Sequence, residues 1–141
     1  MAPAPQGILF LCVANSARSQ MAEGLARHLF PDTVAVFSAG SEPATLNPFA
    51  VKAMAAIDLD ITAHFSKSVA ELPVEKIDLA ITLCAEEVCP VFPHDVEKLH
   101  WAHPDPAAAE GDDEAILASF EAVRDAIHAK LVALREDRFA S

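Results

Sequence analysis

Residues 7–12 read Gly-Ile-Leu-Phe-Leu-Cys, a short apolar run without a charged residue. A strand that is buried on both faces of a sheet has this composition, because neither of its faces meets water. Residues 12–19, Cys-Val-Ala-Asn-Ser-Ala-Arg-Ser, follow and lead into a segment in which apolar residues recur every four positions, over 21–29. The sequence therefore predicts a buried strand, a tight loop and a helix over 17–30.

The same alternation of strand and helix continues along the chain. A helix is predicted over 47–57, because Asn47 suits the cap position and the proline after it suits the first turn. A short helix is expected within 66–72. Short apolar runs predict three further strands, over 33–37, 77–83 and 97–101.

The last helix has the clearest periodicity. Its apolar residues recur every three or four positions with charges between them: Ile116, Phe120, Val123, Ile127, Leu131 and Leu134. We therefore expect one α/β domain over 1–141, with a four-stranded parallel sheet and helices on both faces. Ligands of such sheets bind beyond the carboxyl ends of the strands, where Cys12 and Cys84 are both predicted to lie.

Composition excludes several classes of protein. The 141 residues suit one domain, and a 52% hydrophobic content is sufficient for a core. A formal charge of −11 disfavours binding to nucleic acid or to an anionic membrane. No apolar run approaches the roughly 18 residues of a membrane span, and the N-terminus lacks the features of a signal peptide. Three cysteines do not make a secreted disulfide framework, so we expect a cytoplasmic protein. We also expect it to be a monomer.

The loop after the first strand carries groups that can hold a tetrahedral oxyanion beside a nucleophile. Backbone N–H groups converge in such a turn, and the helix adds the positive end of its dipole. Arg18, six residues after Cys12, can bind two oxygens of the anion with its planar guanidinium. The same groups favour the thiolate of Cys12, the nucleophilic form. The candidate oxyanion-binding loop consists of Val13, Ala14, Asn15, Ser16, Ala17 and Arg18.

The alternative interpretation of this loop is structural. Cys12 would be a core cysteine at a strand end, and Arg18 an ordinary residue on the helix surface. A Cys-x5-Arg pattern occurs often by chance, but the strand before it and the helix after it favour the functional interpretation. Ser19 is a candidate hydrogen-bond partner of the thiolate or a simple helix-start hydroxyl. Asn15 can fix the loop by bonding backbone groups, as turn asparagines do.

Residues 12–24, CVANSARSQMAEG, resemble the signature of the arsenate reductases that are built on the low-molecular-weight protein tyrosine phosphatase fold. The cysteine loop alone marks the phosphatase superfamily, whereas the continuation NSARSQMAEG is specific to the reductase branch. The resemblance implies that the protein reduces arsenate to arsenite, a detoxification reaction, without a cofactor. Further segments match in order between about Gly7 and Arg135: 37–43 (FSAGSEP), 81–84 (ITLC), His100-Trp101 and Asp105-Pro106.

The resemblance also assigns an acid. Displacing an oxygen from the anion needs a proton for the leaving group. An Asp-Pro pair usually forms a turn, but the resemblance makes Asp105 the general acid. Phosphatases of this fold tend to carry tyrosines after this pair, whereas alanines occupy 107–109 here and the chain has no tyrosine. This weakens the interpretation that the protein acts on aryl phosphates. The main alternative function is an acid phosphatase for phosphotyrosine or a small phosphate ester, which would form a phosphocysteine on Cys12. A redox sensor without catalysis is a third alternative.

Cys84 and Cys89 allow three interpretations. They can be a redox-active pair, two zinc ligands together with His94 and His100, or two buried structural cysteines. The gap of four residues between Cys89 and His94 is much shorter than the middle gap of a common zinc finger. The resemblance favours the redox pair, and we expect no metal site.

The resemblance implies a relay of three thiols. Cys12 attacks arsenate, Cys84 attacks the Cys12 sulfur as arsenite leaves, and Cys89 then closes a disulfide with Cys84. Thioredoxin is the implied reductant of this disulfide, and a low-molecular-weight thiol coupled to a glutaredoxin-type protein is the other route in the family. The gap between Cys84 and Cys89 is shorter than in some thioredoxin-coupled relatives, which leaves the reductant open.

One departure concerns an alkali cation. Some relatives bind potassium with an aspartate at the position of Lys67 and with residues that match Asn15, Glu23 and Ser38. Because Lys67 can supply a positive charge of its own, we expect that this chain requires no alkali cation.

Overall fold

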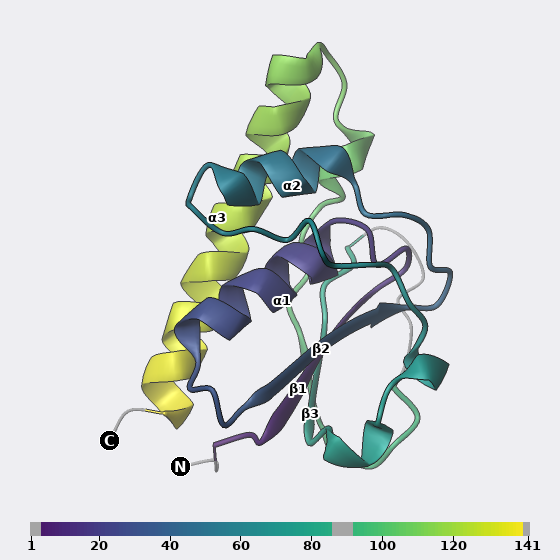
Figure 1. The fold of residues 1–141 in the computed structure, drawn as a ribbon, viewed down its shortest axis with the longest axis vertical. Helices are drawn as coiled ribbons and strands as arrows, with labels where there is room; N and C mark the ends of the chain where they lie inside the picture. Colours follow the sequence, from purple (N-terminus) through teal and green to yellow (C-terminus); the bar gives the residue numbers. More distant parts are fainter. Residues whose placement is uncertain (1–3, 86–91, 140–141) are drawn as a thin grey trace.

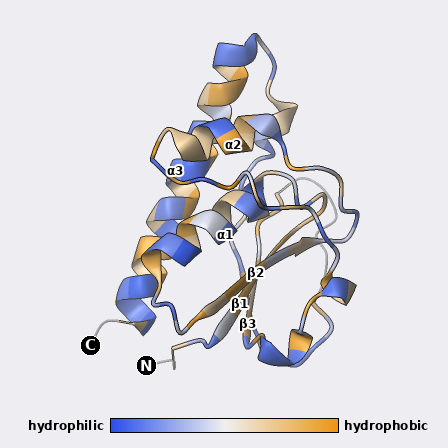
Figure 2. Ribbon diagram, viewed as in Figure 1, coloured by the Kyte–Doolittle hydropathy of each residue, from blue (hydrophilic) through white to orange (hydrophobic). Residues whose placement is uncertain are grey.

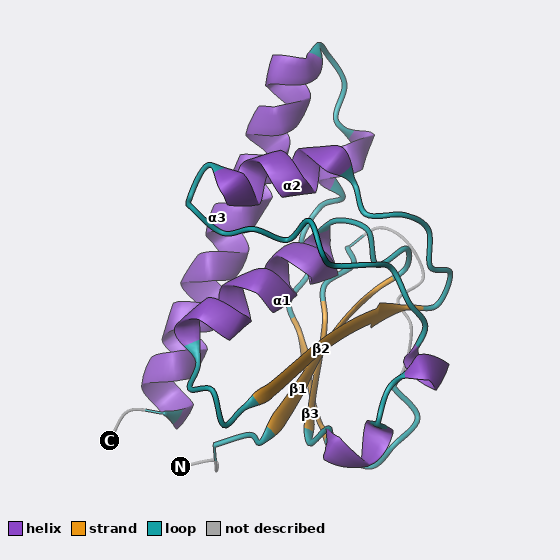
Figure 3. Cartoon of the chain, in the orientation of Figure 1, coloured by secondary structure: helices purple, strands orange, loops and turns teal. Residues whose placement is uncertain are grey.

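The computed structural model describes residues 4–85 and 92–139, which form a four-stranded sheet with three α-helices (Figures 1 and 3). The elements follow the alternation that the sequence predicts. In chain order they are β1 (Gly7–Cys12), α1 (Arg18–Leu29), β2 (Ala35–Gly40), α2 (Pro48–Ala55), the short 3-10 helices η1 (Val69–Glu71) and η2 (Val74–Lys76), β3 (Leu79–Thr82), β4 (Glu97–His100), the 3-10 helix η3 (Pro106–Ala108) and α3 (Asp113–Arg138).

The four strands are parallel and lie in the order β2-β1-β3-β4. In this register Cys12, the last residue of β1, pairs with Gly40, the last residue of β2. On the other side of β1, Leu11 pairs with Thr82 of β3. The carboxyl ends of β2, β1 and β3 therefore meet at one edge of the sheet, as predicted.

The first strand is buried on both faces, which explains its unbroken apolar sequence. Ile8 and Phe10 belong to one hydrophobic cluster, and Leu9 and Leu11 belong to the other. All four side chains are fully buried. Burying such a side chain stabilises the fold by roughly 1.5–3 kcal/mol, so this strand anchors the sheet.

The two faces of the sheet are covered differently. The three α-helices pack together on the face of Ile8 and Phe10, and α3 alternates hydrophobic and hydrophilic residues along its length (Figure 2). The opposite face is covered by residues of η1 and η2 and by Phe92. Helices on both faces were expected, and on this second face the helical elements are 3-10 turns. In the part of the chain that the structure describes, no helix has the length and hydropathy to cross a membrane.

Element boundaries follow local sequence signals at some ends and long-range pairing at others. The Asn47 side chain accepts from the N–H of Phe49 and caps α2, with the proline in the first turn as predicted. The second strand extends beyond the predicted 33–37 to Gly40, because its residues continue to pair with β1 as far as Cys12. The short helix expected within 66–72 is η1, three residues long.

Candidate active site

Cys12 ends the central strand and is nearly inaccessible, with 2% of its surface exposed. Its thiol is free. The backbone then turns away from the sheet and enters α1 at Arg18, so residues 13–17 form the loop that the sequence predicts between strand and helix.

Hydrogen bonds to the loop carbonyls orient its peptide planes. The carbonyls of Val13, Ala14 and Ser16 accept from backbone N–H groups of residues 42, 44 and 47, at 2.9–3.0 Å. The N–H and C=O of a trans peptide point in opposite directions. The amides that follow these carbonyls therefore face the other side of the loop, as an anion-binding turn at the start of a helix requires.

Ser19 contacts the nucleophile directly. Its Oγ lies 2.9 Å from the Cys12 sulfur. The same oxygen accepts a hydrogen bond from Nδ2 of Asn15 at 2.7 Å, which leaves the hydroxyl hydrogen for the sulfur. A donor aimed at the sulfur stabilises the thiolate, so Ser19 is better explained by this role than as a simple helix-start hydroxyl.

Asn15 connects this pair to a distant segment of the chain. It is fully buried and has a φ of 50°, a left-handed conformation that asparagine tolerates better than most residues. Its Oδ1 accepts from the N–H of Lys67 at 3.0 Å, and its carbonyl accepts from Ser66 Oγ at 2.7 Å. The fixing of the loop by Asn15 is therefore observed, with partners about fifty residues away.

Gln20 is a residue that the sequence analysis did not identify. Its Nε2 lies 3.1 Å from both the carbonyl oxygen and Oδ1 of Asn15, and 2.8 Å from the carbonyl of Phe65. It is fully buried on the first turn of α1. Its position directly after the predicted loop is the one sequence signal for this role. Apolar periodicity does not reveal that the amide is buried.

The Arg18 guanidinium reaches across the site to another loop. Its Nη1 donates to the carbonyl of His103 at 3.0 Å, and the residue is 4% exposed. This contact joins the start of α1 to the segment that carries Asp105, two residues further on. The interpretation of Arg18 as a helix-surface residue is therefore wrong.

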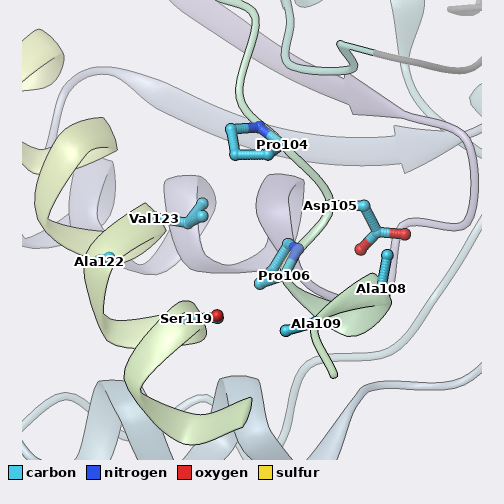
Figure 4. Close-up of a pocket in the computed structure, with 8 residues that line it drawn as sticks. All are labelled: Pro104, Asp105, Pro106, Ala108, Ala109, Ser119, Ala122 and Val123. Atoms are coloured by element: carbon cyan, nitrogen blue, oxygen red, sulfur yellow. The ribbon is translucent and has the colours of Figure 1, made fainter. Parts of the chain in front are cut away.

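Asp105 caps a short turn beside a pocket. Its Oδ1 accepts from the N–H of Ala107 and thereby starts η3, in agreement with the turn-forming tendency of Asp-Pro. A pocket of about 640 Å³ lies between this loop and α3, where Ser119, Ala122 and Val123 line it (Figure 4). The Asp105 carboxylate lies on the side of the loop away from those helix residues (Figure 4).

Cys84 follows the third strand and lies at the same sheet edge as Cys12. The N–H of Leu83 donates to the carbonyl of Leu11 at 2.9 Å. Cys12 is the residue after Leu11, and Cys84 is the residue after Leu83. Cys84 is 1% exposed and is disulfide-bonded. Cys89, its expected partner, lies outside the described residues.

The zinc interpretation finds no support in the described residues. A disulfide-bonded Cys84 is not a thiolate ligand. His100 is hydrogen-bonded to Thr82 through Nδ1 at 2.6 Å, and the ring of His94 packs against Phe92. Within 4–85 and 92–139, no three His, Cys, Asp or Glu side chains are grouped as metal ligands.

A buried carboxylate lies behind the loop, at the residues that match the potassium site of some relatives. Glu23 is 5% exposed and accepts from Ser38 Oγ and from Arg27 Nε. The Lys67 ammonium lies 3.8 Å from the same carboxylate. The charges of Arg27 and Lys67 thus compensate Glu23, which leaves little attraction for an additional cation.

The charge balance of this cluster also depends on the titration of His64 and Lys67. Burial lowers the pKa of His64, whose Nε2 lies 3.8 Å from Glu23. Burial also lowers the pKa of Lys67, and the Glu23 carboxylate opposes that shift. The ammonium of Lys67 further donates to the Phe65 carbonyl at 3.0 Å and lies over the Phe65 ring.

The chain is similar to known proteins over nearly its whole length. The model of the family described as low molecular weight phosphotyrosine protein phosphatase matches residues 7–138. An arsenate reductase of Halalkalibacterium halodurans is 45% identical over 131 residues, which cover 92% of this chain and 94% of that protein.

Solved structures agree with this similarity. An arsenate reductase in the oxidized state matches with a TM-score of 0.78 at 27% identity, over 94% of this chain and 98% of that one. The thioredoxin-dependent arsenate reductase of Corynebacterium glutamicum matches with a TM-score of 0.69 at 28% identity, over 97% of this chain and 65% of that one. The cysteine loop, the parallel sheet and these similarities together establish that the chain belongs to the low molecular weight phosphotyrosine protein phosphatase family.

Proposed function

We propose that this protein reduces arsenate to arsenite with its own cysteine thiols. The observation that carries the proposal is the placement of Cys12 and Cys84. Cys12 follows Leu11 and Cys84 follows Leu83, and these two leucines are joined by a backbone hydrogen bond at the carboxyl edge of the sheet. One of these cysteines is a free thiol held by a hydroxyl, and the other is already engaged in a disulfide. A phosphatase needs the first cysteine alone, whereas a reductase needs both.

The first step forms a bond between sulfur and arsenic. The Cys12 thiolate attacks the arsenic(V) atom of arsenate while the loop amides and Arg18 bind the anion oxygens. One oxygen leaves, and Asp105 donates a proton to it, so that water departs. Ser19 stabilises the thiolate before the attack and is itself not consumed. Arsenic stays in the +5 state in this step.

The second step transfers two electrons to arsenic. In the reduced protein, in which Cys84 is a thiol, the Cys84 thiolate attacks the Cys12 sulfur, and a disulfide forms between them as the sulfur–arsenic bond breaks. The electron pair of that bond stays with arsenic, which leaves as arsenite. The Cys89 thiolate then attacks the Cys84 sulfur, which frees Cys12 and leaves a Cys84–Cys89 disulfide. We assign this last pair from the sequence, since Cys89 lies outside the described residues.

A dithiol protein is the reductant that suits the last disulfide. Thioredoxin is our first candidate, because a relative with this fold is a thioredoxin-dependent arsenate reductase. A low-molecular-weight thiol coupled to a glutaredoxin-type protein is the alternative. Both occur in the reducing cytosol, so we propose that the protein acts there, as a monomer.

The test is steady-state arsenate reduction with each reductant in turn. Reduced protein is mixed with arsenate and either thioredoxin, thioredoxin reductase and NADPH, or glutathione, glutaredoxin, glutathione reductase and NADPH. NADPH consumption that depends on arsenate, with arsenite measured as the product, supports the proposal and identifies the reductant. Hydrolysis of p-nitrophenyl phosphate without arsenate reduction would instead favour the acid-phosphatase alternative, which the family itself suggests.

A further inference from the structure

His103 joins three parts of the candidate site through its backbone. Its N–H donates to the carbonyl of Leu83, the residue before Cys84, at 3.0 Å. Its carbonyl accepts from Nη1 of Arg18, also at 3.0 Å. Asp105 follows two residues later. A displacement of this one residue would therefore move the oxyanion-binding arginine, the second cysteine and the acid relative to one another.

The ring of His103 fixes the same segment from within. Its Nδ1 lies 2.8 Å from the carbonyl oxygen of Trp101. A carbonyl oxygen only accepts, so Nδ1 must carry the hydrogen. The residue is 6% exposed, and burial lowers the pKa of His103. The hydrogen bond to the Trp101 carbonyl opposes this lowering of the pKa, and the charges of Lys130 on α3 and Arg18 on α1 add to it.

We propose that His103 is a positioning residue for oxyanion binding: its ring holds the backbone of 101–103 in the conformation that presents the His103 carbonyl to Arg18. Without that bond, the backbone of 101–103 keeps the bonds of the Trp101 N–H to the Thr82 carbonyl and of the His103 N–H to the Leu83 carbonyl, but the ring no longer ties residue 103 to residue 101. The carbonyl that holds Arg18 then moves, and the guanidinium loses its fixed orientation toward the anion. This inference deepens the proposed function and rests on it, because Arg18 is assigned there as the oxyanion-binding side chain.

A merely structural role would have a different signature. Loss of packing at a buried histidine lowers the melting temperature without changing anion affinity selectively. Loss of Arg18 positioning weakens anion binding even where the protein stays folded. The decisive comparison is therefore between variants that keep and variants that lose a donor at the position of Nδ1.

Three variants and one control make this comparison. In His103→Asn the amide nitrogen can take the place of Nδ1, whereas in His103→Gln it lies further out and cannot. His103→Phe keeps the ring and loses the donor. His128→Phe makes the same replacement at an exposed position of α3 and serves as the control.

The primary readout is sulfate binding to the reduced protein, measured as protection of Cys12 from alkylation and resolved by peptide mass. We expect the Phe and Gln variants to bind sulfate roughly tenfold more weakly, as the loss of one hydrogen bond in a buried network implies. The Asn variant and the His128→Phe control should stay within about twofold of the wild type. In arsenate turnover, KM should rise with the sulfate dissociation constant while kcat changes less.

Wild-type sulfate affinity in the Phe or Gln variant would overturn the proposal, and so would equal weakening in the Asn and Gln variants. If the Phe variant does not fold, the Asn and Gln pair still decides. Sulfate binding needs neither arsenate nor the later cysteines. A protein that shows the expected sulfate pattern but no arsenate turnover would refute the proposed function and leave the role of His103 standing. Arsenate turnover without the expected sulfate pattern would support the proposed function and refute the role of His103.

Discussion

Replacing Gly40 by alanine should damage the oxyanion site by a purely steric route. Gly40 ends β2 opposite Cys12. A Cβ added at Gly40 would lie 2.9 Å from the backbone nitrogen of Asn15 and 2.9 Å from the carbonyl oxygen of Cys12, and closer still to the carbonyl oxygen of Val13. All of these atoms belong to the backbone of Cys12 or of the oxyanion-binding loop, so no side chain can move away to relieve the contact.

The magnitude follows from what must move. Overpacking of this kind costs about 1–3 kcal/mol, which for a chain of this size lowers the melting temperature by roughly 3–12 °C. If the loop is displaced and the strand is not, the Cys12 sulfur and the Arg18 guanidinium shift relative to the anion. A displacement near 1 Å at a reacting group reduces rate by about 100-fold, so kcat/KM for arsenate should fall by roughly one to two orders of magnitude.

Gly24→Ala is the matched control. A Cβ at Gly24 would meet Met54 Cε at 2.8 Å, the end of a flexible side chain, and Ile61 Cγ2 at 2.9 Å, so both contacts are with side chains and neither is with the backbone of the loop. Alanine also favours the interior of α1 by up to about 1 kcal/mol. Both variants are compared by thermal unfolding, sulfate binding and arsenate turnover. Wild-type kcat/KM and sulfate affinity in Gly40→Ala, or an equal loss of activity in Gly24→Ala, would refute the steric argument.

Three other predictions address separate parts of the molecule. Cys84→Ser should abolish multiple-turnover arsenate reduction yet keep hydrolysis of p-nitrophenyl phosphate, where that hydrolysis is detectable; arsenate turnover at the wild-type rate would disprove the relay. Because Lys67 and Arg27 already compensate Glu23, replacing potassium by sodium or choline at constant ionic strength should change activity and melting temperature little, within about twofold in kcat/KM; a strong potassium dependence would contradict this. Hydrogen bonding to Arg138 lowers the pKa of Glu97. The Glu97 side chain is 40% exposed, so water screens the pair. The small stabilisation relative to Glu97→Gln, below about 1 kcal/mol, should therefore be present at pH 7 and disappear as the pH falls through that lowered pKa. Identical melting curves at pH 7 would show that the pair contributes nothing.

Local sequence signals determined much of the fold. The uncharged run of residues 7–12 became a strand buried on both faces, because only apolar side chains are stable there. Asn47 capped its helix through its own side chain, which is a contact between near neighbours. The periodic apolar residues from Ile116 to Leu134 form one helix for the same kind of reason, since a period near 3.6 places them on one face. The candidate nucleophile and arginine also follow from short spacing, because both belong to one strand-loop-helix unit.

Tertiary structure alone decided which distant groups complete the site. Arg18 bonds a carbonyl 85 residues away, and Asn15 bonds an N–H 52 residues away. The register of the strands likewise places Gly40 so close to the loop backbone that there is no room for a Cβ. Backbone N–H and C=O groups are nearly the same in every residue, so the sequence does not encode which of them will pair across the fold. Those partners become defined only when the parallel sheet brings the carboxyl ends of its strands together, which is why His103 and Gly40 could not be recognised before the structure was known.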